Sequence, residues 1–128
     1  MAVRIVRLGS ERLPHEGVRI GTVRRPPRGV AKSRFASGNW YDTWLPELSP
    51  SPELVALGLA ATNDKEWARF VSKFRGEMKA PAASHALDLV ATLSHHADVS
   101  LGCYCEDEAR CHRSVLRALL EDRDATFA

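Results

Sequence analysis

The sequence has no hydrophobic run long enough to cross a membrane. A membrane-spanning helix needs about 20 consecutive apolar residues, and charged residues interrupt every apolar segment of this chain well before that length. The first residues, Met-Ala-Val-Arg-Ile-Val-Arg, also lack the long apolar stretch and the cleavage site of a secretory signal. We therefore expect a soluble cytoplasmic protein without a membrane partner.

Cysteine is scarce and is confined to one segment. All three cysteines lie between Cys103 and Cys111, whereas the disulfides of a secreted domain would spread their pairs along the chain. The clustering favours reduced thiols that serve as core residues, as ligands or as reactive groups. The sequence also lacks a glycine-rich phosphate loop, a paired catalytic carboxylate motif and a Ser-His-Asp signature, so no familiar motif identifies a reaction.

Negative charge is nearly missing from the first third of the chain. Residues 1–39 contain nine arginines and lysines against two glutamates, although the net charge of the whole chain is only +2. This asymmetry indicates an anionic partner near the N-terminal third, either a small anionic ligand or a nucleic acid. A basic face that is simply solvated is the alternative.

Hydrophobic periodicity predicts an α/β fold with a small, mostly parallel sheet flanked by helices. Residues 3–8 and 18–23 alternate as half-buried strands do, and residues 99–105 have the pattern of a buried strand in a parallel sheet. A length of 128 residues suits one domain, which we expect to span residues 1–128, with a core at about 3–122 and a short tail at 123–128.

Local signals place the helices. Ser51 and Pro52 are typical of an N-cap and a first helical position, and this helix is expected to end near Ala60. A second helix, capped by Asn63 or Asp64, carries apolar residues at helical spacing. The sequence predicts a third helix from Pro81 to the His95-His96 pair and a last one that begins at Asp107 or at Cys111.

A long loop is expected between the second strand and the first helix. Pro26 and Pro27 exclude a helix there, and loops of this length in compact domains are commonly functional or mobile. Trp40 and Tyr41 follow the loop and could stack on a base, although burial in the core is the more usual role of such residues.

The cysteine segment is the main candidate for chemistry. On a strand, Cys103 and Cys105 share one face with Val99 and Leu101, and a turn then crosses the carboxyl edge of the sheet, where ligands bind in open α/β folds. A helix that starts near Cys111 would direct its free N–H groups and its positive dipole end toward the same place.

Three interpretations of this segment remain open. In the first, the helix start holds an anion, and arginines of the basic loop close the site. In the second, Cys103, Cys105, Cys111 and His112 bind zinc, although the usual two-residue gap between paired cysteines is absent. In the third, the cysteines only pack in the core. We expect no structural zinc, because the ligand spacing is atypical and the apolar core is large enough without a metal.

Three segments resemble a known family. They are Arg19 to Lys32, Trp44 to Leu54 and Cys111 to Ser114, and the resemblance runs in order from about Val3 to Asp122. They are similar to the YeaO-like family of small prokaryotic proteins, a domain of unknown function. The resemblance implies a single Rossmann-like layered α/β domain and no established reaction.

Particular positions carry this resemblance and two depart from it. The family pattern has an arginine followed by a tryptophan-proline-arginine-glycine turn. Arg24 stands at the first arginine, and Pro27, Arg28 and Gly29 stand at the last three positions of the turn. Val23 stands where the family has an aspartate, and Pro26 where it has the tryptophan. The Cys-His-Arg ending is like that of longer relatives in the same family.

Our functional hypothesis is a pocket for a phosphate-bearing ligand, a nucleotide or a nucleic-acid end, with catalysis at the Cys-His-Arg helix start. The catalytic residues would be Cys111 and His112, and the phosphate-binding residues Arg24, Arg28, Arg113 and Ser114. The alternative is a thiol-based redox or metal-responsive protein without substrate turnover. We further expect Cys103 and Cys105 to be largely buried, His112 or Arg113 to reach a surface cleft, and the basic loop to lie beside the last helix at the carboxyl edge of the sheet.

Overall fold

The sheet is small and entirely parallel. The computed structural model describes all 128 residues and contains four strands in the order β1-β4-β2-β3. They are β1 (Val3–Arg7), β2 (Val18–Gly21), β3 (Thr43–Trp44) and β4 (Val99–Cys103). β4 lies between β1 and β2, with Leu101 opposite both Ile5 and Ile20. Because the strands are parallel, their carboxyl ends meet at one edge of the sheet.

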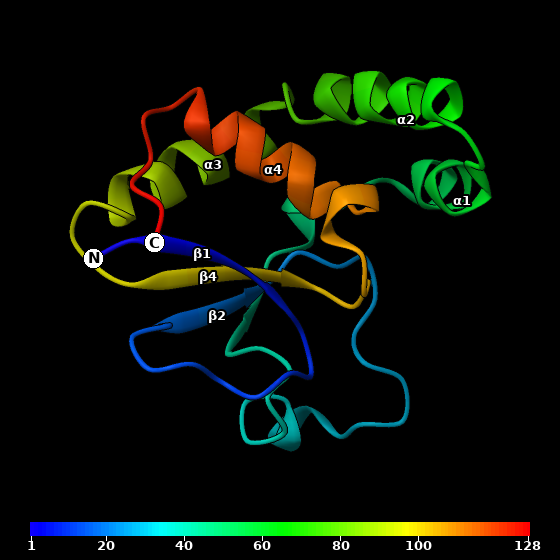
Figure 1. The fold of residues 1–128 in the computed structure, drawn as a ribbon. Coiled ribbons are helices and arrows are strands. Elements are labelled where there is room, and N and C mark those ends of the chain that lie inside the picture. Colours follow the sequence, from blue (N-terminus) through cyan, green and yellow to red (C-terminus); the bar gives the residue numbers. More distant parts are fainter.

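The α-helices lie together on one face of this sheet, above it in Figure 1. They are α1 (Pro52–Ala60), α2 (Asp64–Glu77), α3 (Pro81–Leu93) and α4 (His112–Glu121), and short 3-10 turns occur at η1 (Lys32–Arg34), η2 (Pro46–Leu48) and η3 (Glu108–Arg110). The long loop that leaves β2 runs on the other side, below the sheet in the figure. The expected α/β class, a small parallel sheet flanked by helices, is confirmed. None of the helices is long and apolar enough to span a membrane.

The helix boundaries follow the local signals in the sequence. The Ser51 hydroxyl accepts from the backbone N–H of Leu54 at the start of α1, and the Asn63 side chain accepts from that of Glu66 at the start of α2. Each cap satisfies a donor that the first helical turn leaves free. The two-residue strand β3 was not predicted, because a pair of residues shows no periodicity.

One apolar core joins the sheet to the helices. Its fully buried members include Leu101 from β4, Phe74 from α2, Leu87 from α3 and Leu116 from α4. The expected tail at residues 123–128 is attached to this core, because Phe127 packs against it and forms a β-bridge with Val3. Residues near the C-terminus therefore pair with β1 at the edge of the sheet.

The opposite face of the sheet is organised by a buried arginine. Arg19, in β2, is fully buried and forms an ion pair with Glu16, Nε to Oε1 at 2.6 Å and Nη2 to Oε2 at 3.0 Å. Its Nη1 also donates to the carbonyl oxygens of Ser10 and Asn39. The guanidinium therefore ties the β1–β2 connection and the end of the long loop to one strand. From the sequence, Arg19 is expected only as one of the nine basic residues of the first third.

We predict that Glu16→Ala strongly destabilises the fold. The substitution leaves the buried Arg19 guanidinium without its counter-charge, and breaking a buried pair in this way typically costs about 3–5 kcal/mol. The free energy of unfolding in urea measures this loss. Glu11→Ala, at an exposed position, is the matched control and should change stability by no more than about 0.5 kcal/mol.

The same pair should make stability depend on pH. Burial acts to raise the pKa of Glu16, but hydrogen bonds from Arg19 and from the Leu13 N–H, together with the charge of Arg19, lower it below the usual value. A lowered pKa in the folded state means that this stability is present above the unfolded pKa and is lost as the pH falls through the folded pKa. A pH-stability profile that is unchanged in Glu16→Ala would contradict this role.

Candidate functional site

The turn after β4 resolves the two helix starts that the sequence allowed. The Asp107 side chain accepts from the Ala109 N–H and caps the 3-10 turn η3, and Cys111 is the N-cap of α4. The start at Cys111 is therefore confirmed for the last helix, whereas Asp107 caps only the short turn before it. α4 begins directly over the carboxyl edge of the sheet, where the positive end of its dipole favours an anion.

A cleft at this edge brings the cysteine segment and the basic loop together. Its volume is about 380 Å³, within the range of small-molecule sites. Cys111 and His112 line it from α4, Arg24 and Arg25 from the loop, and Trp67 from α2. We call it the thiol cleft; its other lining residues are Val23, Pro50, Pro52, Val55, Gly58, Leu59, Phe70, Cys103, Tyr104, Cys105 and Arg110. The start of the loop, at Arg24 and Arg25, lies beside the start of the last helix as predicted, whereas Arg28 does not line this cleft.

Cys111 and His112 form a pair with a fixed proton arrangement. The Nε2 atom of His112 lies 2.6 Å from the Thr22 carbonyl oxygen. Since a carbonyl only accepts, Nε2 carries the proton and donates it there. In the neutral ring Nδ1 is then an acceptor, and it lies 3.7 Å from the Cys111 sulfur. This is the arrangement of a nucleophile, a base and a group that orients the base.

The electrostatics of the three thiols favour a thiolate at Cys111. Hydrogen bonds from Cys103 and Cys105, assisted by His112, lower the pKa of Cys111 despite its burial. Hydrogen bonding to Cys105 and Cys111, together with burial, raises the pKa of Cys103. The pKa of Cys105 is also raised, because its bond to Cys111 and its burial outweigh the bond from Cys103. The N-terminal position on α4 adds to the preference for charge at Cys111.

Arg113 lies next to this cluster but not in the cleft. It is buried, with Nη1 donating to the Val6 carbonyl and Nη2 to the Cys105 carbonyl, both at 2.6 Å. No carboxylate pairs with it, and its Nε has no hydrogen-bond partner. Its positive charge acts to lower the pKa of Cys105. A buried cation without a carboxylate is best compensated by a negative charge on the thiol cluster.

The predicted phosphate-binding residues are divided by the fold. Arg24 lines the thiol cleft, where its guanidinium also donates to the carbonyl oxygens of Ser49 and Pro50. Ser114 uses its hydroxyl to bond the Cys111 carbonyl inside the first turn of α4. Arg28 lines a second, neighbouring cleft. Of the four predicted phosphate-binding residues, only Arg24 lines the thiol cleft with Cys111 and His112.

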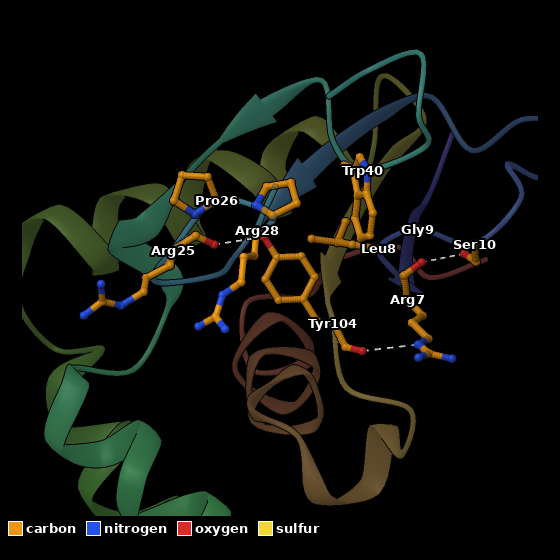
Figure 2. Close-up of a pocket in the computed structure, with 10 residues that line it drawn as sticks. Arg7, Leu8, Gly9, Ser10, Arg25, Pro26, Arg28, Trp40 and Tyr104 are labelled. Atoms are coloured by element: carbon orange, nitrogen blue, oxygen red, sulfur yellow. Dashed lines mark hydrogen bonds between the residues drawn. The ribbon is translucent and has the colours of Figure 1, made fainter. Parts of the chain in front are cut away.

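The second cleft, which we call the arginine cleft, is drawn in Figure 2. Its volume is about 640 Å³ and its lining residues are Arg7, Leu8, Gly9, Ser10, Arg25, Pro26, Pro27, Arg28, Trp40 and Tyr104. Arg25 and Arg28 extend on one side of the Tyr104 ring and Arg7 on the other (Figure 2). The Tyr104 hydroxyl donates to the Arg25 carbonyl at 2.8 Å and so fastens the loop to the segment after β4.

One group of side chains could hold a metal ion. The ligand atoms of Cys103, Cys111 and His112 all lie within 4.8 Å of one another. Cys105 is adjacent, with its sulfur 3.8 Å from that of Cys103. The tertiary structure therefore brings together residues whose spacing in the sequence argued against a metal site.

The predicted exposures hold in part. Cys103 is buried as expected, whereas Cys105, beyond the end of β4, is only half-buried. His112 reaches a cleft although only 7% of it is exposed. Trp67 and Phe70 also line the thiol cleft, which the sequence does not predict, because their helical spacing is that of core residues. They stack with ring centroids 4.7 Å apart, and no signal in the sequence separates core from cleft for such a pair.

We predict that Cys111 is the cysteine that is alkylated at low pH. Its lowered pKa keeps the thiolate present under conditions in which Cys103 and Cys105 stay protonated, and the thiolate is the nucleophile. In chelator-treated protein, iodoacetamide labelling followed by peptide mass spectrometry should show Cys111 modified at about pH 6. A labelling rate for Cys111 that still rises tenfold per pH unit up to about pH 8 would contradict this assignment.

His112→Ala is the companion variant. It removes the imidazole that takes the Cys111 proton on Nδ1 and then donates back to the thiolate, an interaction that lowers the pKa of Cys111, so labelling of that cysteine should shift to higher pH. His96→Ala, an exposed position after α3, is the control and should leave the labelling profile unchanged.

Comparison with known proteins places the chain in one family. The family DUF488-N3a, described as the active DUF488-N3 subclade, matches the chain over residues 3–124. No curated protein and no solved structure matches the chain.

Proposed function

The chain belongs to the DUF488-N3a family, and from the geometry of its thiol cleft we propose that it binds a phosphate-bearing ligand, a nucleotide or a nucleic-acid end, with catalysis by Cys111 and His112. One observation carries the proposal. Guanidinium groups, aromatic rings and the Cys111–His112 pair all line a single cleft, so the groups that would hold a phosphate and a base surround the reactive sulfur.

Charge supports an anionic ligand. The thiol cleft is lined by Arg24, Arg25 and Arg110 and by no carboxylate. Arg110 is neutralised by Asp64, but Arg25 makes no side-chain hydrogen bond or ion pair within the chain. Its guanidinium is therefore free to bind a phosphate, while Arg24 is oriented by the two backbone carbonyls that it contacts.

Aromatic surface supports a ligand that contains a base. Trp67 is partly exposed in the cleft and stacks on the buried Phe70, which in turn stacks on Phe74. The Arg110 guanidinium lies 5.8 Å from the centre of the Trp67 ring. Aromatic rings next to cationic groups form the usual platform for nucleic-acid bases.

The reactive pair suits nucleophilic substitution. With the thiol proton on His112 Nδ1, the Cys111 sulfur would form a bond to the electrophilic phosphorus or carbon of the ligand as the bond to the leaving group breaks. The leaving group would take the proton from His112. Water would then release the bound group, give a proton back to the pair and restore the thiol.

The test is a binding screen with nucleotides. Nucleoside mono- and triphosphates should raise the melting temperature, and Arg25→Ala should weaken the affinity by about tenfold, or about 1.4 kcal/mol. Arg34→Ala, an exposed loop position outside both clefts, is the matched control. Equal affinities for wild-type protein and Arg25→Ala, or no binding by any nucleotide, would refute the proposal.

Cys111→Ser separates binding from chemistry. It keeps the size of the side chain, so nucleotide affinity should be retained, whereas any turnover found with the wild-type protein should be lost. Turnover that survives in this variant would remove Cys111 from the mechanism.

A metal-responsive protein without turnover is the second candidate. The ligand atoms of Cys103, Cys111 and His112 lie within 4.8 Å of one another. The bond from His112 Nε2 to the Thr22 carbonyl is the kind of contact that orients a ligating histidine. The half-buried Cys105 offers a further sulfur beside them.

Metal analysis decides between the two candidates. Under the proposed enzyme, the protein purified without chelator should contain well under one zinc per chain, and nucleotide binding should survive chelation. One tightly held zinc per chain, lost together in Cys103→Ser and His112→Ala, would favour the second candidate.

Two finer assignments belong with this proposal. The segments at residues 24–29 and 111–114 support a place near the YeaO-like proteins within the wider family. Three free cysteines in one cluster support a reducing compartment such as the prokaryotic cytoplasm.

A further inference from the structure

We propose that the arginine cleft holds the nucleotide next to the one in the thiol cleft, so that the ligand is a single strand of nucleic acid and not a free nucleotide. This inference rests on the proposed function and names the substrate class of the same site. Its basis is the way in which the two clefts are joined and charged.

The two clefts form one continuous surface. Arg25 and Tyr104 line both of them, so the Tyr104 side chain is the shared wall. The wall is held in place from both sides, because the Tyr104 hydroxyl donates to the Arg25 carbonyl and the Tyr104 carbonyl accepts from Arg7 Nε. A strand that leaves the thiol cleft past this ring enters the arginine cleft directly.

The charge along this surface has one sign. The arginine cleft is lined by Arg7, Arg25 and Arg28 and, like the thiol cleft, by no aspartate or glutamate, although the chain contains 16 acidic residues. Arg28 makes no side-chain hydrogen bond or ion pair. Besides its bond to the Tyr104 carbonyl, Arg7 pairs with the exposed Glu106, Nη2 to Oε1 at 3.4 Å. A mononucleotide in the thiol cleft leaves Arg28 without a phosphate, whereas a strand supplies a phosphate for each nucleotide.

The arginine cleft also contains a surface for a base. The Trp40 and Tyr104 rings meet edge to face with centroids 6.0 Å apart, and both remain partly exposed. Trp40 is positioned against Gly9, where an added Cβ would come within 2.9 Å of its ring. Figure 2 shows the two rings between Arg28 and Arg7. Aromatic rings between cationic groups are typical of surfaces that bind single strands without reading their sequence.

Fluorescence anisotropy with labelled oligonucleotides of about eight nucleotides tests the inference. We expect the dissociation constant of the labelled single strand to be at least about tenfold lower than that of a mononucleotide measured by competition. Arg28→Ala should weaken strand binding by about fivefold or more. It should also reduce the slope of the logarithm of the binding constant against the logarithm of the salt concentration by about one, as expected for the loss of one phosphate contact. Its mononucleotide affinity should be unchanged. Arg25→Ala should weaken both, and Arg34→Ala neither.

The arms of the experiment separate the possible failures. DNA and RNA strands of one sequence are compared. A blunt hairpin whose stem contains this sequence serves as the duplex control and should bind more weakly than the strand. If mononucleotides bind but strands bind no more tightly, or if Arg28→Ala matches the wild-type protein, this inference is wrong and the proposed function stands. If strands bind through Arg28 and mononucleotides do not bind, the proposed function of the thiol cleft is wrong and the strand site remains.

Discussion

The buried ion pair between Arg19 and Glu16 is the interaction on which the rest of this structure depends. Arg19 is fully buried in β2 and also bonds the carbonyl oxygens of Ser10 and Asn39. It therefore attaches the connection after β1 and the end of the long loop to the sheet, which has no α-helix on that face (Figure 1). Gly9 and Trp40 adjoin these two carbonyl groups and line the arginine cleft. The buried Arg19–Glu16 pair, which cannot be broken without leaving a charge unpaired in the interior, therefore positions one wall of the arginine cleft.

The parallel sheet supplies the second constraint. Its carboxyl edge collects the ends of β1, β2 and β4 and the N-terminus of α4 in one place, which is where open α/β folds bind ligands. Five arginines line the two clefts at this edge without a carboxylate among the lining residues. Arg113 adds a buried positive charge beneath them. Asp64 and Glu106 pair with Arg110 and Arg7, but the Arg25 and Arg28 guanidinium groups have no partner in the chain, so the potential at this edge is positive and favours an anion.

The Cys111–His112 pair is compatible with catalysis and with metal binding for the same physical reason. The bond from His112 Nε2 to the Thr22 carbonyl selects the tautomer in which Nδ1 has a free lone pair beside sulfur. That lone pair can take a proton from Cys111, or it can share a metal ion with Cys103 and Cys111. The arginine lining of the cleft favours proton transfer from Cys111 over metal binding, since free guanidinium groups beside the cysteines contribute nothing to a closed thiolate-metal site.

Local features of the sequence determined the elements of this fold, and long-range packing decided the site. The period-two pattern of Val3–Arg7, the Ser51 cap and the alternative starts at Asp107 and Cys111 depend on residues a few positions apart, so they could be predicted. The burial of Arg19 and Arg113, the separation of Arg28 from Arg24 and the cleft position of Trp67 depend on partners far away in the chain. The approach of Cys103 to Cys111 and His112 belongs with these, because it needs β4 and the start of α4 to meet across a turn. A side chain's type and spacing state what it can bond to, and only the packed chain decides which partner lies within reach.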